Sequence, residues 1–150
     1  MPPASSGLTN PDSRRPVETS SFRILIADNF EPWRRFASST LEKDESLQIV
    51  GMAGSGLEAV QKAIELKPDL VLLSLGLFPQ TNGIEAANRI IKAVPGVKLL
   101  FATHMIDPDV MTEVLSNGAD GYILKMDAQR ELLPAIRAIR RGEKFIGSGI

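Results

Sequence analysis

Short apolar segments recur along the chain from Phe22 onward, and they alternate with segments in which apolar residues return every three or four positions. The apolar runs are FRILIA, LQIVGM, LVLLS, VKLLFA and GYILK, which begin at residues 22, 47, 70, 97 and 121. They are apolar almost throughout, as is typical of strands that are covered on both faces. The sequence therefore predicts five buried β-strands.

The segments between and after these runs have helical spacing. Apolar residues recur at i, i+3, i+4 and i+7 within residues 33–41, 57–64, 84–94, 110–115 and 132–139. Asp107-Pro108 is typical of a helix start and Asn117-Gly118 of a helix end. Pro134 removes one helical hydrogen bond inside the last segment, but the apolar spacing continues beyond it. We therefore expect a helix after every strand.

Strict alternation of strands and helices predicts the architecture. Right-handed crossovers produce a parallel sheet with helices on both faces, so the fold class is a three-layer α/β/α sandwich. Functional groups of such sheets lie at the carboxyl ends of the strands. The polar residues at those ends are Asp28, Asn29, Ser74, Thr103, His104 and Lys125.

Composition sets the domain organisation. With 150 residues and 43% hydrophobic content, the chain can form one domain with a substantial core. Residues 1–21 are rich in Pro, Ser and Thr and have no apolar period, which predicts a disordered tail. The folded domain is then expected to begin at residue 22.

Residue counts exclude several classes of function. Lys and Arg total 17 against 18 for Asp and Glu, so no overall charge favours nucleic acid or an anionic membrane. The absence of Cys and the single His argue against disulfides and zinc sites. The sequence has no apolar stretch near the roughly 20 residues of a membrane span, and its N-terminus lacks a signal-peptide core. We therefore expect a cytoplasmic protein without membrane contacts.

Four motifs carry a resemblance to a known family. ILIADN, DLVLLSLGL followed by NGIEAANRI, LLFATH and GADGYILK resemble the receiver domain of two-component response regulators. The resemblance covers about residues 22–142, and ELLPAIRAIRRGEKFI is similar to receivers of LuxR/NarL-type transcription regulators. It implies a flavodoxin-like fold with strand order 2-1-3-4-5 and a role in phosphorelay signal transduction and transcription regulation. It also implies that the domain covers residues 22–142 and that residues 143–150 begin a linker to an output domain that this chain does not contain.

The resemblance also implies roles for individual residues. In the family, an aspartate after the third strand accepts a phosphoryl group from a histidine kinase, and Mg²⁺ is held by that aspartate and an acidic pair after the first strand. The corresponding positions here are Ser74 for the acceptor, Asp28 and Asn29 for the acidic pair, Thr103 for the switch hydroxyl, Tyr122 for the switch aromatic and Lys125 for the phosphate-sensing lysine.

A serine at the acceptor position changes the expected chemistry. A seryl oxygen cannot form the acyl-phosphate and brings no charge to Mg²⁺, whose affinity for oxygen sites follows the number of charged ligands. We therefore expect a pseudo-receiver that a histidine kinase does not phosphorylate, with no catalytic residue and no cofactor. Mg²⁺ would bind only if the vestigial site of Asp28, Asn29 and Ser74 still holds it. Lys125, lacking an acceptor charge, is expected to pair with Asp28.

Three other interpretations of these residues remain open. The domain could be switched by a small ligand in the vestigial pocket, or by phosphorylation of a hydroxyl by another type of kinase. A different class is a small α/β serine hydrolase with Ser74 as nucleophile, His104 as base and Asp28 as orienting group. The nucleophile-elbow motif is missing from LLSLG, and consecutive Thr103 and His104 should point to opposite sides of an extended segment.

Interaction surfaces follow from the resemblance. Relatives form dimer or effector contacts through the first and last helices, or through the face from the fourth helix to the last, so we expect a protein partner or a homodimer there. The first helix offers Arg34 and Arg35 on a face expected to be exposed. DNA contact is expected only through an output domain.

Overall fold

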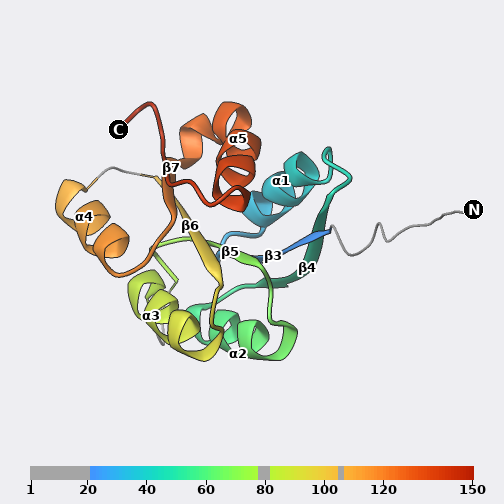
Figure 1. The fold of residues 1–150 in the computed structure, drawn as a ribbon, viewed down its shortest axis with the longest axis vertical. Helices are drawn as coiled ribbons and strands as arrows, with labels where there is room; N and C mark the ends of the chain where they lie inside the picture. Colours follow the sequence, from blue (N-terminus) through green and yellow to red (C-terminus); the bar gives the residue numbers. More distant parts are fainter. Residues whose placement is uncertain (1–20, 78–81, 105–106) are drawn as a thin grey trace, which may run out of the picture.

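The computed structural model describes residues 21–77, 82–104 and 107–150. Strands and helices alternate as predicted (Figure 1). The strands are β3 (Phe22–Ala27), β4 (Leu47–Ala53), β5 (Leu70–Leu73), β6 (Lys98–Thr103), β7 (Gly121–Leu124) and β8 (Phe145–Ile146). The helices are α1 (Glu31–Leu41), α2 (Gly56–Leu66), α3 (Gly83–Ala93), α4 (Pro108–Ser116) and α5 (Ala128–Arg140), with a short 3-10 helix η2 (Lys125–Asp127) before α5.

All strands pair in parallel in the order β4-β3-β5-β6-β7-β8. The first five positions reproduce the predicted order 2-1-3-4-5 and confirm the flavodoxin-like fold. The prediction of five strands is wrong, because Phe145–Ile146 adds a sixth strand beside β7. Two residues are too few to show a strand period, and their place in the sheet is fixed by β7 alone.

Two apolar layers lie on opposite faces of the sheet. One packs beneath α2, α3 and α4, and includes Phe101 and Tyr122. The other packs beneath α1 and α5, and includes Trp33 and Leu132. Each residue of β5 and β7 is buried, as expected for strands covered on both faces.

Several local predictions can be compared with these elements. α5 continues through Pro134, as the apolar spacing indicated. The Asp107 carboxylate caps α4 by accepting the amides of Asp109 and Val110, and Pro108 is the first helical residue. The predicted tail of residues 1–21 lies almost wholly outside the described residues, so the domain boundaries stay a prediction. None of the described helices is long and apolar enough to cross a membrane.

Candidate functional site

Asp28 lies directly after β3 and is fully buried. Its backbone N–H extends the pairing with β4 by donating to the Ala53 carbonyl at 3.0 Å. Carboxylate oxygen Oδ1 accepts the Phe30 N–H at 2.8 Å, and Oδ2 lies 2.6 Å from Lys125 Nζ. A buried carboxylate needs such compensation, since an unpaired charge in this position would be costly.

Lys125 provides that compensation from the end of β7. Its side chain is 8% exposed, and Nζ lies 5.1 Å from the centre of the Trp33 ring. The aromatic face attracts the ammonium and covers it from water. The predicted Asp28–Lys125 ion pair is therefore confirmed, and it connects β3 to the start of the segment that leads into α5.

Ser74 follows β5 and is buried. Its N–H donates to the Ala27 carbonyl at 3.1 Å, and its hydroxyl oxygen accepts the Gly76 N–H at 3.3 Å. The loop returns close to this strand end at Gly83, where an added Cβ would lie 2.1 Å from the Ser74 carbonyl oxygen. Ser74 thus satisfies backbone groups in a turn that only glycine at position 83 allows to close.

The remaining predicted site residues occupy different environments. Thr103 ends β6 in register with Leu124, beside Lys125, and is half-buried. Asn29 and His104 are exposed. His104 is not needed to balance Asp28, whose carboxylate already pairs with Lys125, so the geometry gives no support to a hydrolase triad.

Tyr122 is fully buried in β7, with its ring centre 6.5 Å from that of Phe101. Its hydroxyl has no hydrogen-bond partner among the described residues. Burial raises the pKa of this hydroxyl, and the negative charge of Asp107 raises it further. Tyr122 therefore presents an inward-facing, neutral aromatic side chain.

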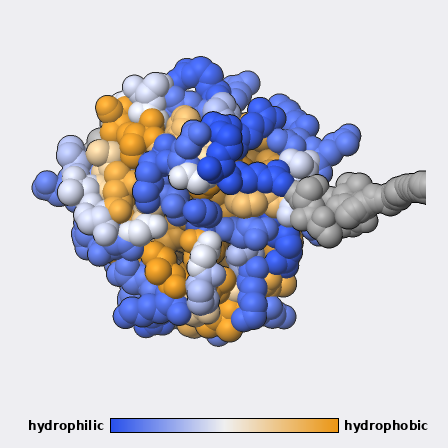
Figure 2. Space-filling view, in the orientation of Figure 1, coloured by the Kyte–Doolittle hydropathy of each residue, from blue (hydrophilic) through white to orange (hydrophobic). Residues whose placement is uncertain are grey.

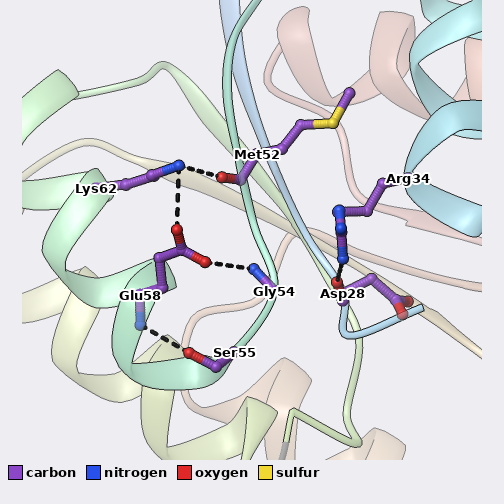
Figure 3. Close-up of polar contacts among 7 residues, drawn as sticks. All are labelled: Asp28, Arg34, Met52, Gly54, Ser55, Glu58 and Lys62. Atoms are coloured by element: carbon purple, nitrogen blue, oxygen red, sulfur yellow. Dashed lines mark hydrogen bonds and ion pairs between the residues drawn. The ribbon is translucent and has the colours of Figure 1, made fainter. Parts of the chain in front are cut away.

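Arg34 belongs to this site, although the sequence placed it on an exposed helix face. It is half-buried, and Nη1 donates to the Asp28 backbone carbonyl at 2.6 Å (Figure 3). The site thus combines one carboxylate, that of Asp28, with the cations Lys125 and Arg34. Helical spacing alone cannot reveal this contact, because it depends on how α1 begins relative to β3.

A second group beside Arg34 orders the end of β4 (Figure 3). Glu58 Oε1 accepts the Gly54 N–H at 2.7 Å, and Lys62 Nζ lies 3.2 Å from Oε2. The Glu58 N–H in turn donates to the Ser55 hydroxyl at 3.1 Å. The Gly54 hydrogen bond, and then Lys62 and Arg34, hold the pKa of Glu58 below its usual value despite some burial. The spacing Ser55-x-x-Glu58 is the capping-box signal that would have found this group.

The donor set at the strand ends is poor for a divalent cation. Of the three positions that hold Mg²⁺ in the family, Asp28 alone is charged, and its charge is already met by Lys125. Within the described ranges, no group of three or more His, Cys, Asp or Glu residues could hold a metal ion. The residues present therefore do not fit the magnesium site that the resemblance implies.

Comparison with known proteins identifies the fold's family. The family model of the response regulator receiver domain matches residues 24–137. The chain is similar to the oxygen regulatory protein NreC of Staphylococcus aureus, with 37% identity over 124 residues that make up 83% of this chain and 57% of that protein. The chain thus spans little more than half the length of this relative.

Solved structures agree with the sequence comparison. A LuxR-family two-component response regulator from Aurantimonas sp. SI85-9A1 has a TM-score of 0.82 at 28% identity, covering 87% of this chain and 93% of that one. The response regulator domain of Thermotoga maritima CheB has a TM-score of 0.72 at 30% identity, covering 78% and 94%. The match over most of the domain and the shared fold lead to one conclusion: this chain belongs to the response regulator receiver domain family of two-component signalling, with relatives of the LuxR/NarL type.

Proposed function

We propose that this receiver domain signals through protein–protein contacts and is not phosphorylated by a histidine kinase. The observation that carries the proposal is the serine at the acceptor position beside an Asp28 carboxylate that Lys125 already neutralises. A phosphoryl switch needs an acceptor carboxylate, a metal and a lysine that is free to contact the phosphoryl group. In this site the Lys125 ammonium already lies against Asp28, where a bound metal ion would otherwise balance the carboxylate.

The wider role follows from the relatives. We infer that the protein acts in transcription regulation in the cytoplasm, as its similarity to a LuxR-family two-component response regulator implies. Its partner is another protein or a second copy, bound through α1 and α5 or through the face from α4 to α5, and DNA is reached only through an output domain. No cofactor is required, and Mg²⁺ binds weakly or not at all.

The test is a titration with Mg²⁺ and the phosphoryl mimic beryllofluoride. Trp33 fluorescence is a suitable readout, because Lys125 Nζ lies 5.1 Å from the ring centre. We expect no change in the natural protein at millimolar ligand. Ser74→Asp should restore a response, and more so together with Asn29→Asp, because each substitution returns a charged oxygen ligand.

A matched control separates charge from shape. Ser74→Asn has nearly the same volume as Ser74→Asp but carries no charge, so it should stay silent. If the natural protein responds at micromolar to low millimolar ligand, the proposal is wrong and the serine site retains a phosphoryl switch.

A further inference from the structure

The C-terminal residues 145–150, named here the strap, cross the edge of the sheet beside β7. Phe145 packs against the apolar layer of α1 and α5, whereas Ile150 packs against the layer of α2, α3 and α4. Figure 1 shows the chain passing β7 and ending on the α4 side, and Figure 2 shows apolar surface gathered there. The strap therefore contacts both layers of the domain.

Besides this apolar packing, two sets of hydrogen bonds hold the strap. Backbone bonds join it to the edge strand: Phe145 N–H donates to the Asp120 carbonyl at 3.0 Å, and Gly147 N–H to the Tyr122 carbonyl at 2.9 Å. The second anchor is Glu131 in the first turn of α5. Its Oε2 accepts both the Ser148 N–H, at 3.0 Å, and the Ser148 hydroxyl.

Gly147 allows the strap to lie this close. A Cβ at this position would lie 2.8 Å from Glu131 Oε1 and 3.4 Å from the Ile123 Cα atom. Any side chain must therefore displace the carboxylate that binds Ser148. Glu131 is 7% exposed, so its carboxylate has little room to move aside. The Oε1 atom has no hydrogen-bond partner in the described part of the chain.

The two anchors flank Lys125, the lysine that pairs with Asp28. One anchor is on β7, which ends at Leu124, and the other is on α5, which begins at Ala128. Lys125 lies in the short η2 turn between them, with its ammonium against Asp28. A displacement of either anchor must be absorbed by this turn, which is only three residues long.

We propose that the strap is detachable and sets the position of Lys125, so that its release loosens the Asp28–Lys125 ion pair. Its few backbone bonds and its exposed Ile146 and Ser148 make local opening much cheaper than unfolding of the core. The domain is then regulated from its C-terminal side without any chemistry at Ser74, so this inference does not depend on the proposed loss of phosphorylation.

Amide hydrogen exchange followed by NMR tests whether the strap opens. In the natural protein the amides of Phe145, Gly147 and Ser148 should exchange faster than those of β5 and β6. Ser148→Ala removes one hydrogen bond to a carboxylate and should speed exchange of the strap amides by about 10-fold. Ser116→Ala is the matched control, because its hydroxyl bonds only within α4 and its loss should leave the strap unchanged.

The coupling needs its own readout. Gly147→Ala should shift the Trp33 indole resonance and speed amide exchange at Lys125. Asp28→Asn should in turn speed amide exchange of the strap, because coupling between two sites is reciprocal. Ser148→Ala is the milder alternative if either variant fails to fold. Strap amides that exchange only as fast as the core would overturn the detachable strap. Faster strap exchange with unchanged Trp33 and Lys125 signals would overturn its control of the ion pair.

Discussion

Among the described residues, two buried carboxylates lie near the end of β7 and are compensated in different ways. Asp28 is fully buried and faces a cation from another strand, Lys125 at 2.6 Å. Glu131 is 7% exposed and is met by the uncharged N–H and hydroxyl of Ser148. The first arrangement removes the net charge from the interior, whereas the second leaves a charge that hydrogen bonds must stabilise. We therefore expect the Asp28 site to depend on its ion pair with Lys125, and the contact between Glu131 and Ser148 to be the weaker of these two interactions.

The largest effect on stability is expected when Lys125, the cation that faces Asp28, is replaced. Lys125→Met keeps the length of the side chain but leaves Asp28 buried without its partner, which should lower the free energy of unfolding by about 3–5 kcal/mol. Urea denaturation followed by circular dichroism measures this loss. Much of it should return in the double variant Asp28→Asn/Lys125→Met, because no uncompensated charge then remains.

An exposed ion pair provides the control for this experiment. Arg35 Nη2 lies 3.7 Å from Glu31 Oε1, and the Arg35 side chain is 74% exposed. Arg35→Gln should therefore change the free energy of unfolding by less than about 1 kcal/mol. Equal losses for Lys125→Met and Arg35→Gln would mean that Asp28 does not rely on its lysine.

These contacts also show what the sequence could and could not predict. The strands β3 to β7 were predictable from their apolar runs, whereas their order was implied by the family resemblance. With that order, the Asp28–Lys125 pair was predictable, because parallel strands bring their carboxyl ends to one edge of the sheet. Strand β8 was not, since two residues carry no period. Arg34 and Glu131 were missed because each lies at a polar position of a helix, and only tertiary contacts show that Arg34 reaches the Asp28 carbonyl and that Ser148 covers Glu131.

A smaller effect is expected when the charge of the second carboxylate is removed. Glu131→Gln retains the shape and an acceptor for Ser148, so it weakens charge-assisted hydrogen bonds without leaving an unpaired charge. The loss in the free energy of unfolding should be about 1 kcal/mol, well below that of Lys125→Met. A loss as large as that of Lys125→Met, measured by the same urea denaturation, would remove the distinction between the two sites.

The smallest expected effect is a change in the pKa of the Glu131 carboxyl. Burial raises the pKa of its carboxyl, but the two Ser148 hydrogen bonds and the positive charge of Arg130 outweigh burial and bring the pKa below the ordinary value of 4.5. A lowered folded-state pKa means that the contribution of Glu131 to stability is present above pH 4.5 and is lost as the pH falls through the folded value. Ser148→Ala should therefore raise this pKa, in a titration of the Glu131 carboxyl carbon by NMR. An unchanged pKa would mean that the hydroxyl does not bind the carboxylate, and the Ser148 N–H would then be the only part of Ser148 that joins the strap to Glu131.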